Sequence, residues 1–237
     1  MKSILVKDEV HLKSLIEEEI KIQGLACDLN HLDVSQVTDM NMIFCGSPFN
    51  GDISKWNVSN VTIMSFMFNQ AKFNGDISKW NTSKVTDMSG MFQDSKFNGD
   101  IGRWNVSNVT DMSTMFGSSQ FNGDISQWNV SNVIDMRWMF AGSCFNGDIS
   151  QWDVSNVIDM YGMFAESGYN KDLTDWRPYS LNNKENMFDN FGELQPYWYT
   201  APDTQEALKK YQEIEALKES LESKLDSNTK GSKKVKI

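Results

Sequence analysis

A unit of 24 residues recurs through most of this sequence and restricts the folds open to it. The segment FNGDISKWNVSNVTIMSFMF starts at residue 49 and is followed by four close variants, with no insertion between copies. Weaker copies precede and follow these five. An uninterrupted period of this length predicts a solenoid, in which each copy forms one coil and stacks on its neighbours. We therefore expect about seven coils over residues 25–192, with the altered outer copies as caps.

Within one coil, the apolar positions predict two short elements. Ile53, Trp56 and Val58 follow an Asn-Gly turn signal and have the spacing of a short strand. From Val61 to Phe68, apolar residues three apart favour a short helical or 3₁₀ turn that returns the chain to the next coil. Parallel pairing of successive strands would give an α/β solenoid with these residues in its core. In the central coil, the expected core residues are Phe97, Ile101, Trp104, Val109, Met112 and Phe116.

The unit FNGDIS-W-NVSNVTDM-MF resembles the repeat of the BspA-like leucine-rich-repeat surface proteins of bacteria. The resemblance covers residues 25–192, about 71% of the chain. It implies a right-handed leucine-rich-repeat-type solenoid and a binding role, often adhesion, and it supplies no catalytic residues. Those surface proteins carry an export signal or a lipid anchor, and neither pattern is visible in this sequence.

The segments outside the repeat are expected to be largely helical. Residues 1–24 carry apolar residues mostly at helical spacing and predict an N-terminal helical cap on the open end of the solenoid. Residues 193–227 predict an aromatic, proline-marked joint and then an amphipathic helix over 204–226. The apolar stripe of that helix could fold back on the repeats or pair with a second copy in a homodimer. Residues 228–237 contain four lysines and no acid, which predicts a disordered basic tail.

Charge and cysteine content limit the partners and the compartment. The formal net charge of -10 argues against nucleic acid as a partner. No secretory signal is apparent and no stretch is long enough to span a membrane, so no membrane partner is expected. Three cysteines without a pairing motif suit a reducing compartment. We therefore expect a cytoplasmic protein, or a cell-surface protein if an export leader has been removed.

No motif for catalysis or for a cofactor occurs in the sequence, so we expect neither an enzyme nor a cofactor. Two aspartates recur at the period of the repeat, as at Asp76 and Asp87, and could form a calcium ladder. The alternative, which we favour, is that each carboxylate accepts backbone N–H groups at a turn.

Recurrent tryptophans and asparagines also admit two interpretations. The tryptophan ladder that includes Trp104 could stack sugars, but Leu32 stands in its register in the first coil, which favours a core position. The methionine rows are interpreted as packing. We expect the amides of one asparagine row to bond neighbouring coils. That row contains Asn57, Asn81, Asn105 and Asn129.

Among the positions that differ between copies, three stand out and form the expected binding surface. Residues at equivalent positions of successive copies form a column. In two adjacent columns, some copies have bulky or charged residues where other copies have small ones. Exposed aromatic residues are typical binding anchors, although these could instead pack on the terminal caps. The third column grades from basic to acidic along the solenoid, which could orient a partner. The candidate partner-binding residues are Arg137 and Tyr161 in the first column, Met42, Phe66 and Trp138 in the second, and Lys55, Lys79 and Arg103 in the third.

These observations predict a non-enzymatic protein-protein interaction module that uses the variable columns of a rigid solenoid. The repeat region holds 10 basic and 19 acidic residues, which supports an alternative function. In that alternative, the chain is an acidic inhibitor, of the immunity or phage anti-defence type, that occupies a basic groove of a nuclease or other effector. The salt dependence of binding separates the two functions.

Overall fold

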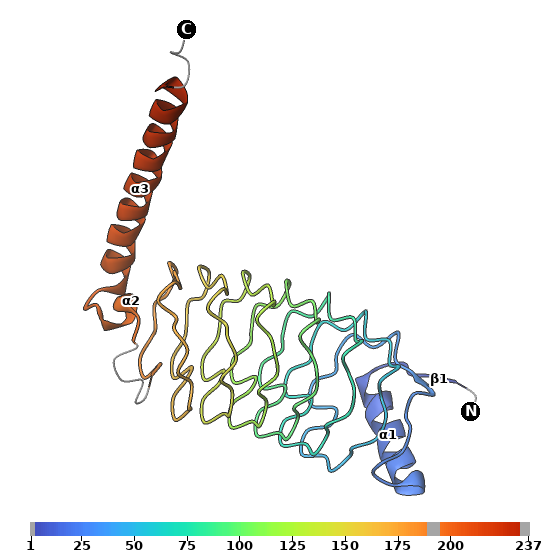
Figure 1. Ribbon diagram of the computed structural model, residues 1–237. Coiled ribbons are helices and arrows are strands. Elements are labelled where there is room, and N and C mark those ends of the chain that lie inside the picture. Colours follow the sequence, from blue (N-terminus) through green and yellow to red (C-terminus); the bar gives the residue numbers. More distant parts are fainter. Residues whose placement is uncertain (1–2, 189–194, 233–237) are drawn as a thin grey trace. The chain divides into compact units, whose positions relative to one another are not determined.

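The computed structural model describes residues 3–188 and 195–232. The chain divides into two compact units, Met1–Gln195 and Pro196–Ile237, and each is described by itself. The first unit is a stack of similar coils that follow one another along the chain (Figure 1). It contains the whole 24-residue repeat, so the chain is a repeat solenoid.

A line of single parallel β-bridges joins the coils of the solenoid, one residue from each coil. Backbone hydrogen bonds accompany the bridges, as where Met64 N–H donates to Asp87 O of the next coil at 2.9 Å. Because every coil has the same length, equivalent residues lie beside one another and form columns along the wall. The bridged column contains Asp39, Ile63, Asp87, Asp111, Asp135, Asp159 and Asn183.

The segment predicted as a strand in each coil is a turn. Asp52 Oδ1 accepts a hydrogen bond from Ser54 N–H at 2.9 Å, and Trp56 N–H donates to Ile53 O at 3.2 Å. Local bonds of this kind bend the backbone and leave no extended run. The strand prediction is therefore wrong, because Leu32–Asp33 is the one regular strand within the described part of the coils.

The predicted helical or 3₁₀ turn is present only as isolated turn bonds and not as a helix. Met67 N–H donates to Met64 O of its own coil at 3.3 Å, whereas the preceding residue, Phe66, donates to Ser89 O of the next coil at 2.8 Å. Successive N–H groups thus alternate between their own coil and the next one, a pattern that differs from that of a helix. No helix occurs in the described residues between Gln23 and Tyr197, so the prediction of an α/β coil is wrong.

Stacked aromatic ladders fill the interior of the solenoid. Trp104 is 4% exposed, its ring lies nearly parallel to that of Trp80 at 6.4 Å, and its Nε1–H donates to Ile77 O at 3.1 Å. The tryptophans of the ladder are thus core residues, as predicted, and not a sugar platform. The predicted core of the central coil is confirmed, since Phe97, Ile101, Trp104, Val109, Met112 and Phe116 are all buried.

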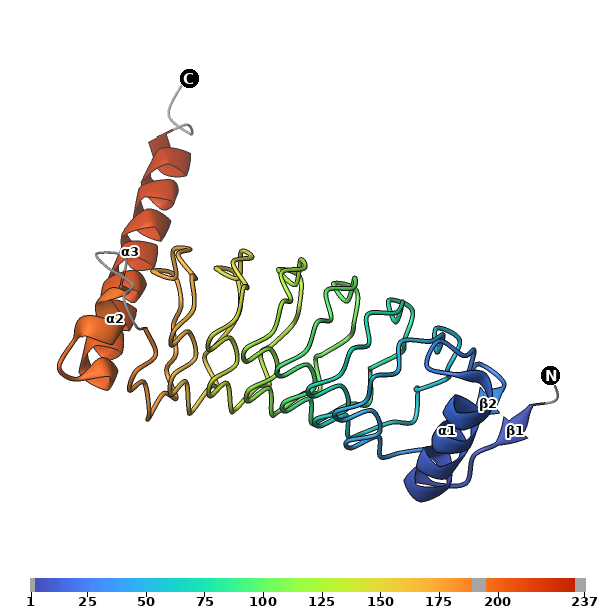
Figure 2. The same cartoon turned by 90° about the horizontal axis from the view of Figure 1, so that it is seen from below.

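The N-terminal residues add one more strand to the stack. β1, Ile4–Leu5, pairs in parallel with β2, Leu32–Asp33 (Figure 2). Ile4 N–H donates to His31 O and Val6 N–H to Asp33 O, both at 2.9 Å. These bonds occupy backbone groups that the first coil would otherwise leave open at the end of the stack.

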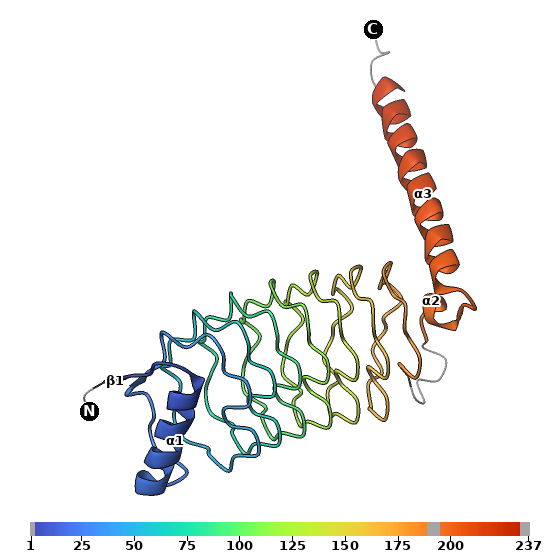
Figure 3. The same cartoon turned by 180° about the vertical axis from the view of Figure 1, so that it is seen from behind.

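Helix α1, Glu9–Gln23, lies across the end of the solenoid next to the first coil (Figure 3). Asp8 caps the helix, because its carboxylate accepts a hydrogen bond from His11 N–H at 2.8 Å. Leu12 and Ile16 are buried, whereas other apolar residues of the expected stripe, such as Val10, are exposed.

The second unit contains α2, Tyr197–Thr200, and α3, Thr204–Ser232. Asp203 Oδ1 accepts a hydrogen bond from Glu206 N–H at 2.9 Å, at the start of α3. Ring stacking of Tyr197 on Tyr211, at 5.4 Å, joins the two helices. Leu208 of α3 is buried.

Helix α3 is longer than the sequence predicts. It continues to Ser232, so the predicted disordered tail over 228–237 is wrong for residues 228–232, and residues 233–237 lie outside the described part. The apolar residues in the middle of the helix, Ile214, Leu217 and Leu221, are 50 to 64% exposed. No helix in the two described ranges is long and apolar enough to cross a membrane.

Candidate functional site

Two columns of the solenoid wall have a left-handed backbone, with φ between +52° and +66°. Glycine takes this conformation without strain, whereas a bulky L-residue in it is an outlier. The first, which we call the aromatic column, contains Met42, Phe66, Gly90, Thr114, Trp138, Gly162 and Asn186. The second, the rim column, contains Gly46, Gln70, Asp94, Ser118, Gly142 and Glu166.

Trp138, Tyr161 and Arg137 form one cluster on this wall. The rings of Trp138 and Tyr161 meet edge to face with centroids 5.0 Å apart. Trp138 is 38% exposed and Tyr161 is partly exposed. Arg137 is exposed, but Asp135 accepts hydrogen bonds from its guanidinium, at 2.7 Å to Nη2, and raises its pKa. The cluster therefore presents two aromatic rings beside a cation that is already paired.

Each aromatic side chain of this column leans over the glycine of the next coil. A Cβ atom at Gly162 would lie 2.5 Å from Cε3 of Trp138, so only glycine leaves room for the ring in its present position. Phe66 covers Gly90 in the same way and is partly buried. Phe66 stands three coils away from Trp138, on the order of 14 Å at the usual spacing of paired strands, so the two are separate anchors.

A groove of about 360 Å³ lies beside Trp138, and we call it the tryptophan groove. Its floor consists of Gly117, Ala141 and Ala165, the residues between the aromatic and rim columns. The sequence analysis does not predict this groove, although a change of residue type along the repeat indicates it. The column that forms the floor, which we call the floor column, changes from Cys, Asn and Gln in the early coils to Gly, Ala and Ala. The complete lining is Gln93, Thr114, Gly117, Ser118, Trp138, Ala141, Gly142, Ala165 and Glu166.

The remaining sequence-predicted site residues lie apart from this groove. Met42 is 45% exposed and stands at the first coil of the aromatic column. Lys55, Lys79 and Arg103 are exposed at the position just before the buried tryptophan of each coil, in a different part of the wall. The structure thus brings together three of the eight predicted residues.

The recurrent aspartates act at turns, as we favoured. The hydroxyl and the backbone N–H of Ser78 donate to Asp76, and these bonds lower the pKa of Asp76. Hydrogen bonds from Ser54 lower the pKa of Asp52 in the same way. Within the described residues, no group of three or more His, Cys, Asp or Glu side chains is placed to hold a metal ion.

The asparagine row that we expected to join coils does not do so. Asn105 Oδ1 accepts a hydrogen bond from Ser107 N–H of its own coil at 3.1 Å, and Asn57, Asn81 and Asn129 behave alike. That prediction is wrong because a side-chain oxygen reaches the N–H two residues later more readily than another coil.

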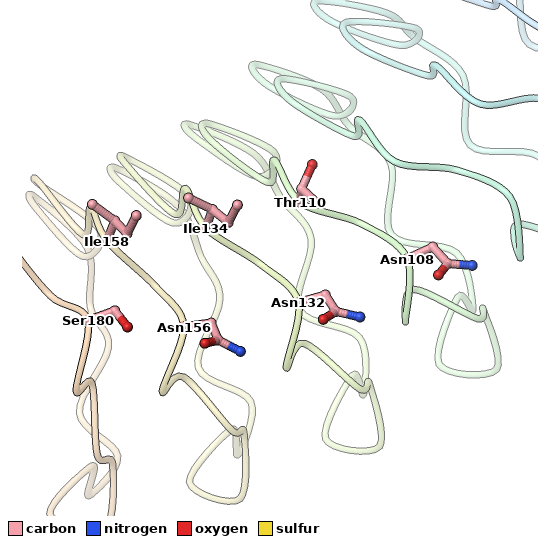
Figure 4. Close-up of a pocket in the computed structure, with 7 residues that line it drawn as sticks. All are labelled: Asn108, Thr110, Asn132, Ile134, Asn156, Ile158 and Ser180. Carbon is pink, nitrogen blue, oxygen red and sulfur yellow. The ribbon is translucent and has the colours of Figure 1, made fainter.

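Another asparagine row does bond neighbouring coils, and it lines a second, shallow hollow of about 550 Å³ (Figure 4). Asn132 Nδ2 donates to Ser107 O of the preceding coil at 2.7 Å, and Asn108 and Asn156 do the same to their own neighbours. Ile134 and Ile158 border the hollow and are 45% and 41% exposed. Each of these three amides thus bonds the preceding coil, and Ile134 and Ile158 add apolar contact area to an otherwise polar lining.

The repeat region of the chain is similar to one known protein family. One protein family matches over two overlapping stretches, residues 12–122 and 94–200, which together include the solenoid and α2. No curated protein and no solved structure matches the chain. The matched stretches cover well over half of the sequence. The chain therefore belongs to the family described as Mycoplasma protein of unknown function, DUF285.

Proposed function

We propose that the chain is a non-enzymatic binding protein that engages a protein partner through Trp138, Tyr161 and the tryptophan groove. The observation that carries the proposal is the exposed aromatic pair on a wall where Gly90, Thr114 and Asn186 occupy the equivalent positions. Exposed aromatic residues beside a hollow are typical centres of protein interfaces. Phe66 would serve as a second anchor further along the wall.

The backbone of the aromatic column supports a binding role for its bulky residues. An L-residue in the left-handed region costs on the order of 1–2 kcal/mol, and Gly162 avoids this cost in the next coil. A tryptophan retained at such a position, with much of its ring in solvent, contributes less to folding than a buried one. Strained residues of this kind cluster at functional sites.

The anchors are also held rigidly. Trp138 N–H donates to Tyr161 O at 2.9 Å, and Thr114 N–H donates to Arg137 O at 2.7 Å, so the backbone at Arg137 and Trp138 is bonded to both neighbouring coils. A preorganised surface loses little conformational entropy when it binds. We also propose that the solenoid is right-handed and of the leucine-rich-repeat type found in the BspA-like proteins.

Capture of the partner by the full-length chain tests this function. The immobilised parent, a Phe66→Ser/Trp138→Ser variant and a Gln70→Ser control are exposed to lysate of the source cells, and retained proteins are identified by mass spectrometry. Gln70 is exposed and has the same left-handed backbone, with φ of 54°, but lies away from the groove. The double variant should lose a partner that the parent and the control retain. Equal capture by a folded double variant contradicts the proposal.

The charge of the solenoid favours one other candidate, the acidic inhibitor of a nuclease or similar effector. Residues 25–192 carry 10 basic and 19 acidic residues, and many of the aspartates have lowered pKa values and stay ionised. Binding by charge alone would weaken steeply with ionic strength. Binding centred on aromatic anchors would weaken far less between low and high salt, so the steepness of a salt series with the captured partner separates the two functions.

A homodimer through α3 is a further part of the proposal. Ile214, Leu217 and Leu221 form an exposed apolar stripe, and parallel pairing of two copies would place Glu213 beside Lys218 of the other helix. Light scattering with size separation should show a concentration-dependent dimer that a Leu217→Lys variant abolishes. A parent chain that stays monomeric at every concentration contradicts this.

A further inference from the structure

The tryptophan groove exists because three consecutive coils lack a side chain that earlier coils have. In the earlier part of the floor column, Asn69 is buried and its Nδ2 donates to Gln93 at 3.3 Å, so amide side chains fill the wall. Gly117, Ala141 and Ala165 then replace these amides. Because the missing volume belongs to three successive coils, the groove follows the direction of the stack.

The two walls of the groove carry groups that both attract a cation. Trp138, in the aromatic column, offers a partly exposed ring, and Glu166, in the rim column, is exposed. An aromatic face and a carboxylate each stabilise a positive charge, and together they can surround one. Among the described residues, no salt bridge involves Glu166, and no lysine or arginine lines the groove.

The surroundings of the groove strengthen this preference. The three coils over residues 97–168 contain eight acidic and two basic residues. Of the two basic residues, Arg137 is nearer in sequence to Trp138, and its guanidinium is turned to Asp135 at 2.7 Å. The local field is therefore negative, and it favours cationic groups over neutral ones.

We propose that the tryptophan groove binds a lysine or arginine side chain of the protein partner, with the cation against Trp138 and paired with Glu166. This inference rests on the proposed function and adds the chemistry that the partner must present. A sugar ring could also stack on Trp138 and bond the polar lining. The negative charge favours the cation, because a neutral sugar gains nothing from it.

Small probes test the groove without knowledge of the partner. N-acetyl-arginine amide and N-acetyl-lysine amide are titrated into the full ¹⁵N-labelled chain, with N-acetyl-norleucine amide as the neutral control and cellobiose as the sugar. The Trp138 indole N–H resonance reports binding. The ladder indoles serve as internal references, since their N–H groups donate to backbone carbonyls of buried residues.

Two variants have matched controls within the chain. Glu166→Gln removes the carboxylate from the groove, and Asp94→Asn removes one from the same column, with the same left-handed backbone, outside the lining. Ala141→Gln fills the floor with the side chain that Gln93 places at the equivalent position, so the fold should accept it.

The cationic probes should move the Trp138 resonance and bind about tenfold more tightly than norleucine or cellobiose. Glu166→Gln should weaken them about fivefold to tenfold and Ala141→Gln should abolish binding, whereas Asp94→Asn should have little effect. Equal binding of the neutral probe or of the sugar overturns the inference, as does an equal effect of Asp94→Asn. Partner capture that depends on Trp138 but not on Glu166 overturns this inference alone, and capture that depends on neither residue overturns the proposed function as well.

Discussion

The contact between Trp138 and Gly162 gives a quantitative prediction for Gly162→Ala. The backbone at Gly162 has φ of +61°, so alanine there costs about 1–2 kcal/mol from strain alone. The new Cβ would lie 2.5 Å from Trp138 Cε3, so the ring must move into solvent. If the 38% exposed ring loses on the order of 100 Å² of covered area, the additional loss is about 2.5 kcal/mol. The total expected loss of unfolding free energy is about 3.5–4.5 kcal/mol.

A double-mutant cycle separates the two contributions. Urea unfolding, followed by circular dichroism, is measured for Gly162→Ala in the parent and in a Trp138→Ser background. In that background, only the backbone strain of about 1–2 kcal/mol should remain. Gly46→Ala is the control, because its φ is +66° and nothing lies within 4 Å of the new Cβ. The same cost for Gly162→Ala in both backgrounds would refute the packing of Trp138 on this glycine.

Three other predictions concern stability. Trp104→Ala should lower the unfolding free energy by about 3–5 kcal/mol in urea, because a buried aromatic ring and its hydrogen bond to Ile77 are lost, whereas exposed Arg103→Ala should change it by less than about 0.5 kcal/mol. A chelator should leave Tm unchanged, since the aspartates are held by turn hydrogen bonds; a drop of several degrees would restore the calcium hypothesis. The pKa values of Asp52 and Asp76 are lower in the folded chain than the unfolded value of about 3.9, so their ionised forms stabilise the fold above that pH. Tm should therefore be steady near neutral pH and fall as the pH drops below about 4.

The period of the repeat made the core predictable. Once the copies are aligned, apolar residues such as Phe116 recur at every coil and Trp104 at every coil after the first, and large apolar residues that repeat in this way are buried. The local backbone was not predictable from the apolar spacing. Residues three apart suggested a helical turn, but the N–H of Phe66 bonds the next coil, and only the stack of coils provides that partner.

The candidate site was predictable in part. Trp138 and Tyr161 stood out because other coils have small or polar residues at these positions, and the structure places their rings 5.0 Å apart. The tryptophan groove escaped notice because it arises from missing side chains at Gly117, Ala141 and Ala165. The change to small residues is visible in the sequence, but the depth that it creates depends on side chains of neighbouring coils, which a single repeat does not reveal.

Quenching of tryptophan fluorescence by acrylamide tests the central claim most directly. Seven of the eight tryptophans are at most 4% exposed, and Trp138 is 38% exposed, so the quenchable emission of the native chain should come from this one residue. Trp138→Phe should remove that component, which verifies the assignment. If the protein partner binds over the aromatic pair and the groove, saturation with a tryptophan-free form of the partner should protect the component from acrylamide. A partner that binds fully and leaves the quenching of Trp138 unchanged would contradict the account.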